Sequence, residues 1–131
     1  MNLWQAQAEG AALLRAAGIE GAARDADRIL AAVLDIEPGQ LRITEDRALT
    51  RDEATRYHRG IAARALRQPV AQIVGFRDFW AHRFKVTRDT LDPRPETEAL
   101  VEAALVRPWR SVLDLGTVSY THLTLPTICS V

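Results

Sequence analysis

The run Asp114-Leu115-Gly116-Thr117 contains the residue types that could form a ligand site. It ends the apolar segment Ser111–Leu115, whose pattern is typical of a buried strand. In α/β folds, a buried strand that opens into a glycine-containing turn presents backbone N–H groups where ligands bind. The pattern is weak on its own, because cradles for phosphates or nucleosides usually need several glycines. Asp114 either orients this loop or caps the turn that follows.

Few other residues have catalytic or metal-binding chemistry. His58 shares a helical face with apolar residues, so we expect it to lie in the core. His82 is expected at the exposed tip of a hairpin. We assign no role to His122 and Cys129, which lie near the C-terminus. These residues have no spacing that is typical of a metal site.

Composition indicates a globular chain of one domain, or of one small domain and part of a second. Of the 131 residues, 47% are hydrophobic and 26% are charged. Basic and acidic residues number 17 each, so no net charge attracts nucleic acid or a membrane.

One cysteine excludes an intramolecular disulfide, and no apolar run approaches the ~20 residues that span a bilayer. The N-terminus lacks the pattern of a secretory signal. We expect a cytoplasmic protein that binds neither nucleic acid nor a membrane directly.

The first part of the chain is predicted to be a small bundle of helices. Apolar residues recur at helical spacing over 2–17 and 22–34. A third helix starts at Thr50, because Thr50-Arg51-Asp52-Glu53 has the capping-box pattern. A helical turn is expected over 40–43, and a short helix over 69–74 precedes Gly75. A bundle of this size has a thin core and gains by packing on another element.

A hairpin and a proline-rich break follow the bundle. Phe79-Trp80 and Phe84-Lys85-Val86 are predicted strands, joined by Ala81-His82-Arg83. No helix can run through Asp92-Pro93-Arg94-Pro95, because proline lacks an N–H and restricts the residue before it. A new helix is predicted to start at Thr97. We expect Phe79 and Trp80 to pack between the helical front and the part that follows.

Several segments occur in an order that points to a family. They are Gln68–Gly75, Phe79–Trp80, Phe84–Thr87, Pro93–Glu98 and Val112–Thr117. Together they resemble the peptide chain release factor glutamine methyltransferases, and the likeness runs from about residue 1 to 117. The block from Gln68 to Glu98 is its most specific part, whereas the Asp-Leu-Gly-Thr strand would fit many S-adenosylmethionine enzymes.

The resemblance implies an α+β chain that has three parts up to residue 117. Residues 1–72 correspond to a helical domain that docks the substrate, and 73–92 to a β-hairpin linker. Residues 93–117 correspond to the first helix and strand of a truncated Rossmann-like methyltransferase domain. In such enzymes S-adenosylmethionine methylates the side-chain amide of the glutamine in a release factor's Gly-Gly-Gln motif. The release factor is then the protein partner.

The resemblance also implies a cofactor site. Its residues here are Arg94, Thr97, Glu98, Asp114, Gly116 and Thr117. The segment 93–98 corresponds to one near the methionine end of the cofactor, and Gly116-Thr117 to the cofactor loop. Alternatively, 93–98 is a rigid linker in which Thr97 is an N-cap and the acids complement the helix dipole. Gly116-Thr117 is then an ordinary strand end.

The sequence departs from the family pattern after Thr117. The family continues with two further glycines, but Val118 and Tyr120 stand in their places. No Asn-Pro-Pro-Tyr motif is present to aim the substrate amide, whose nitrogen is a poor nucleophile. Residues 118–131 lack charged residues and resemble translated adapter or vector sequence, with a native C-terminal strand as the alternative. We therefore expect a fragment that is inactive alone.

A helical adaptor that binds a protein partner without cofactor is the alternative function. The enzyme interpretation is favoured because the segments 93–98 and 114–117 have no reason to accompany an adaptor.

Overall fold

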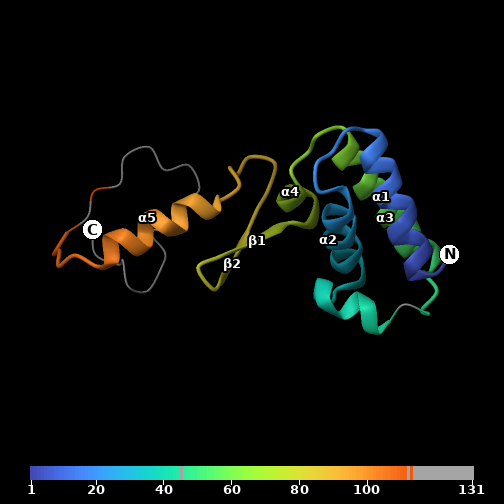
Figure 1. The fold of residues 1–131 in the computed structure, drawn as a ribbon, viewed down its shortest axis with the longest axis horizontal. Coiled ribbons are helices and arrows are strands. Elements are labelled where there is room, and N and C mark those ends of the chain that lie inside the picture. The colour runs from blue at the N-terminus through green and yellow to red at the C-terminus, as the bar shows by residue number, and fades with distance from the viewer. Residues whose placement is uncertain (45, 112, 114–131) are drawn as a thin grey trace. The chain divides into compact units, whose positions relative to one another are not determined.

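The computed structural model describes residues 1–44, 46–111 and 113, and it divides the chain into the units Met1–Val74 and Gly75–Val131. The first unit contains α1 (Leu3–Ala16), α2 (Ala22–Leu34), the 3-10 helix η1 (Pro38–Ile43), α3 (Arg51–Ala65) and α4 (Val70–Val74) (Figure 1). The second contains β1 (Phe76–Phe79), β2 (His82–Lys85) and α5 (Pro95–Leu105). Helices with a small hairpin agree with the predicted α+β content, while the Rossmann-like part stays a prediction.

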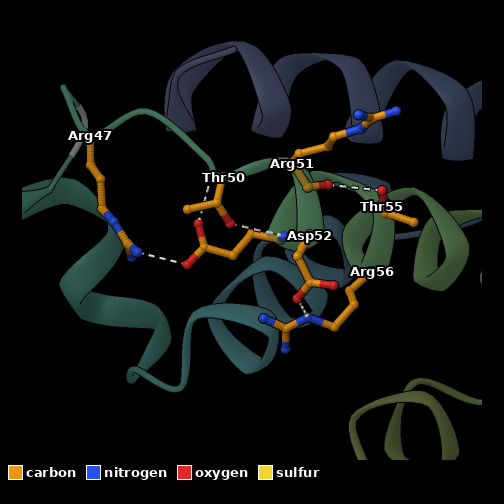
Figure 2. A network of polar contacts seen from close by, with 7 residues as sticks. Arg47, Thr50, Arg51, Asp52, Thr55 and Arg56 are labelled. Atoms are coloured by element: carbon orange, nitrogen blue, oxygen red, sulfur yellow. Dashed lines mark hydrogen bonds and ion pairs between the residues drawn. The ribbon is translucent and has the colours of Figure 1, made fainter.

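The helix starts of the first unit follow the capping signals in the sequence. Asn2 caps α1, where its side chain accepts a hydrogen bond from the Gln5 N–H. The predicted capping box of α3 is confirmed, because the Thr50 hydroxyl accepts from the Glu53 N–H and the Glu53 carboxylate accepts from the Thr50 N–H. Arg47 adds an ion pair to Glu53 at 2.6 Å (Figure 2). The hydrogen bond from the Thr50 N–H to the carboxylate is the main cause that holds the pKa of Glu53 below its usual value, and the charge of Arg47 adds to it.

The core of the first unit lies between α1, α2 and α3. Its largest fully buried side chains are Leu3, Leu14, Ile29, Leu30, Leu41 and Tyr57. Two glycines allow the helices to approach closely. A Cβ at Gly10 would lie 2.9 Å from Cζ of Tyr57, whose buried hydroxyl donates to the Ala6 carbonyl at 3.0 Å. A Cβ at Gly60 would lie 2.6 Å from Ile29. Small residues at these positions therefore set how the helices pack.

The prediction that His58 lies in the core is wrong. His58 is exposed, and its Nε2 lies 3.4 Å from a carboxylate oxygen of Glu9 on α1. The buried face of α3 consists of Glu53, Tyr57, Gly60 and Ile61 instead. The spacing of apolar residues alone did not predict this face, because a buried glycine such as Gly60 adds nothing to an apolar pattern.

A buried ion pair joins three helices of the first unit. Asp25 on α2 is only 4% exposed, and one of its carboxylate oxygens accepts a hydrogen bond from Arg64 Nε at 2.8 Å. Arg64 on α3 also donates to the Gln68 carbonyl, just before α4, at 3.1 Å. The guanidinium thus fixes the start of α4 relative to α2 and α3.

The hairpin is confirmed, but its strands and turn are shifted from the prediction. The strands pair antiparallel from Phe76 opposite Lys85 to Phe79 opposite His82. The turn consists of Trp80 and Ala81, whose φ values are 49° and 61°. Two central residues with positive φ are the geometry of a tight type I′ hairpin, which sequences usually mark with glycine or asparagine. Neither residue is present in this turn, so the sequence did not indicate it. The prediction of a three-residue connection over 81–83 is wrong, and His82 lies in β2.

Helix α5 begins at Pro95, with Arg94 as its N-cap residue. Proline fits the first helical position, because the N–H that it lacks would have no hydrogen-bond partner within the helix at that position. The prediction of a start at Thr97 was two residues late. In the second unit Phe79 and Val101 are buried, with Trp80, Phe84, Leu105 and Trp109 packed against them.

The predicted strand over 111–115 lies mostly outside the described residues. The two described members, Ser111 and Leu113, do not form a strand, and Leu113 is 78% exposed.

Candidate functional site

Three of the predicted cofactor residues lie at the start of α5. Arg94 has an extended backbone, and its carbonyl accepts a hydrogen bond from the Thr97 N–H at 3.0 Å. Thr97 therefore lies inside the first turn, and the alternative that it is the N-cap is wrong. Among the described residues, neither the exposed Arg94 guanidinium nor the Thr97 hydroxyl has a hydrogen-bond partner. Both groups are free to bind a ligand.

Glu98 has a partner that the sequence did not predict. Its carboxylate oxygen Oε1 accepts a hydrogen bond from the Trp80 N–H at 2.9 Å. Trp80 is the first left-handed residue of the hairpin turn, where a side chain other than glycine costs about 1–3 kcal/mol. The charged acceptor offsets part of this cost and links α5 to the hairpin. A polar partner from a distant segment leaves no signal in the local sequence.

The charges at the start of α5 are mainly negative. Glu96 and Glu98 both lie in its first turn, where they complement the positive end of the helix dipole. A cationic group close to this turn would be stabilised, whereas an anion would need Arg94 to balance the two carboxylates.

Asp92 is a further polar residue that the sequence analysis missed. Arg77 Nη1 lies 3.6 Å from one of its carboxylate oxygens, and the other oxygen is buried without a hydrogen-bond partner among the described residues. The pair joins β1 to the segment that precedes α5. The other three predicted cofactor residues, Asp114, Gly116 and Thr117, lie outside the described residues.

An open groove of about 410 Å3 lies on the first unit between α2, α3 and α4. Its lining residues are Ile29, Ala32, Val33, Arg56, Arg59, Gly60, Ala63, Gln68, Gln72, Ile73 and Val74. Arg56 and Arg59 on α3 form part of this lining. Both are exposed, but the groove beside them arises from tertiary packing, which helical periodicity does not predict.

The described part of the chain contains neither a cluster of metal ligands nor a helix that could cross a membrane. Over residues 1–44, 46–111 and 113, His, Cys, Asp and Glu form no group of three or more that could hold a metal ion. Within the same residues, the helices are too short or too polar to cross a membrane.

Known proteins resemble this chain from its first helix onward. The family model described as the PrmC N-terminal domain matches residues 5–75, which is more than half of the chain. The chain belongs to the release factor glutamine methyltransferase family. A release factor glutamine methyltransferase from Cereibacter sphaeroides is 59% identical over 104 residues. Those from Rhodospirillum rubrum and Burkholderia pseudomallei are 43% and 42% identical over 113 and 118 residues.

The chain spans little more than a third of the length of these relatives. The alignments cover 79%, 84% and 86% of this chain but only 37%, 35% and 40% of the relatives. This agrees with the prediction of an N-terminal fragment.

Proposed function

We propose that this chain supplies the substrate-docking unit and the start of the catalytic domain of an enzyme that methylates release factors. The acceptor is the side-chain amide of the glutamine in the Gly-Gly-Gln motif. The family match over residues 5–75 carries this proposal, and the 59% identity to the Cereibacter sphaeroides relative supports it. The enzyme would act in the cytoplasm, where release factors meet the ribosome.

S-adenosylmethionine is the proposed cofactor, and it supplies the methyl group when bound. The start of α5 fits it in part. The free Arg94 guanidinium suits the carboxylate at the methionine end, and the Thr97 hydroxyl can hydrogen-bond beside it. The two carboxylates of the first turn suit the cationic amine and sulfonium of the cofactor.

Glu98 has a different role in this proposal from the one that the resemblance implies. Because Oε1 already accepts from the Trp80 N–H, Glu98 would keep the hairpin turn against α5 and offer only its second oxygen to a ligand. Asp114, Gly116 and Thr117 remain proposed members of the cofactor loop.

The acceptor amide requires positioning that this chain does not contain. Delocalisation into the carbonyl makes the amide nitrogen a poor nucleophile, so the enzyme must aim it at the methyl group. The docking unit contributes by binding the release factor. We expect no methyl transfer by this chain alone, and calorimetric titration with S-adenosylmethionine should detect no binding.

A chimera tests the proposed function. In the Cereibacter sphaeroides relative, the matching segment of 104 residues is replaced by that of this chain, and methylation of a release factor is measured by mass spectrometry. The chimera should methylate the glutamine of the Gly-Gly-Gln motif and leave a release factor with alanine there unmodified. If the parent relative is active and the folded chimera is not, the proposal is wrong.

A further inference from the structure

The groove between α2, α3 and α4 is built before any partner binds. Asp25 and Arg64 join α2 to α3, and Arg64 also binds the Gln68 carbonyl at the start of α4. The walls on all three sides are therefore fixed relative to one another. A preformed site avoids the entropy cost of ordering its parts on binding.

The groove is apolar inside and positive at its edge. The half-buried side chains of Val33, Ile73 and Val74 line it, and Gly60 adds no side chain that would fill it. Arg56 and Arg59 also line it, whereas none of the lining residues in the described part of the chain is acidic. The chain carries equal numbers of acidic and basic residues, so this local excess is not a result of composition.

The two arginines differ in what they already contact. Arg56 Nε donates to Asp52 at 2.9 Å, one turn earlier on α3 (Figure 2). Arg59 is exposed and has no hydrogen bond or ion pair among the described residues. Its guanidinium is thus available to pair with a carboxylate of a bound molecule.

We propose that this groove docks a segment of a protein partner that presents apolar side chains next to an acidic residue, with Arg59 pairing with the acid. The apolar residues would fill the groove, and the ion pair would set their orientation. The inference rests on the proposed function in one respect, namely that the partner is a release factor.

Helix α5 of a second copy is a competing occupant, because it exposes Leu100 beside acidic residues. A test must therefore also follow self-association.

The test measures binding of a release factor to this chain by isothermal titration calorimetry. Arg59→Glu reverses the charge at the groove edge, and Arg51→Glu makes the same change on α3 outside the groove. Ala63→Phe fills the groove without changing the charge. Circular dichroism melts confirm that each variant is folded.

Arg59→Glu and Ala63→Phe should each raise the Kd about tenfold or more, whereas Arg51→Glu should leave it within about twofold. Added salt should weaken binding of the wild-type chain more than that of Arg59→Glu.

Three results would overturn the inference. If folded Arg59→Glu and Ala63→Phe bind as the wild-type chain does, the groove is not the docking site, although the proposed function still holds if the chimera is active. If the wild-type chain does not bind the release factor, docking through this groove is wrong, and the chimera decides separately on the proposed function. If Ala63→Phe abolishes self-association but not release factor binding, the occupant is a second copy.

Discussion

The helical unit and the hairpin unit differ in how they bury their apolar side chains. In the first, Leu3, Leu14 and Leu30 have no exposed surface. The first unit also exposes Ile43 and Leu66, but each of its three long helices buries several residues, whereas α5 in the second unit buries Val101 alone among its described residues and Leu100 is 68% exposed. The hydrophobic effect is proportional to the apolar area removed from water, so the first unit is stabilised by its own core and α5 gains little. The comparison predicts that the two units respond differently to mutation.

The largest expected effect is at the closest contact between helices of the first unit. Gly10→Ala places a methyl group against Tyr57 and disturbs its hydrogen bond to Ala6. Overpacking and a strained buried hydrogen bond should lower the unfolding free energy by about 3 kcal/mol in urea denaturation. Gly39→Ala is the control, because a Cβ added at Gly39 would have nothing within 4 Å of it. Equal stability of the two variants would contradict the packing described for α1 and α3.

A second test compares a buried ion pair with an exposed one. Asp25→Ala leaves Arg64 without its partner in a nearly closed site and should cost about 2–3 kcal/mol. Asp52→Ala removes an exposed pair with Arg56 and should cost less than about 0.5 kcal/mol. The measurement is again urea denaturation. If both cost the same, Asp25 does not join α2 to α3 as described.

Glu53 gives a pH test of the first unit. The pKa of Glu53 is lower in the folded protein than its ordinary value of 4.5. As pH falls below 4.5 the unfolded chain binds the proton first, so the stabilisation is present above 4.5 and is lost through the folded pKa. Glu53→Gln should cost about 1 kcal/mol at pH 7 and should flatten the loss of stability between pH 5 and pH 3. Thermal melts across this range check both effects. An unchanged slope would exclude Glu53 as a source of acid lability.

The smallest expected effect is in the second unit. Glu98→Gln replaces the charged acceptor of the Trp80 N–H with a neutral one and should cost about 0.5–1 kcal/mol locally. Amide exchange at Trp80 should become faster by NMR, while the core of the first unit stays unchanged. Glu96→Gln, on the same turn but exposed, is the control. Identical exchange at Trp80 in both variants would exclude the link between α5 and the hairpin.

The sequence predicted those features that depend on neighbours along the chain. The bounds of α2, the capping box at Thr50 and the short helix before Gly75 follow from periodicity and capping, and all three are confirmed. Pro95 marked the start of α5, but the prediction placed it at Thr97 because proline was considered only as a breaker.

The missed features depend on contacts between segments that are distant in sequence. The hydrogen bond from the Trp80 N–H to Glu98 joins two such segments. The tight turn at Trp80 and Ala81 contains neither the glycine nor the asparagine that usually marks a turn of this kind. The groove beside Arg59 forms only when three helices pack. The candidate site was therefore predictable as the segment at the start of α5, whereas the roles of its side chains required the structure.

Hydrogen exchange of the whole chain, with and without a release factor, tests the central claim most directly. The amides of α1, α2 and α3 should exchange slowly in the free chain, and those of β1, β2 and α5 quickly. Adding the release factor should slow exchange further in α2, α3 and α4 around the groove and leave α5 unchanged. Protection confined to the hairpin and α5, or no change in any segment, would contradict the account.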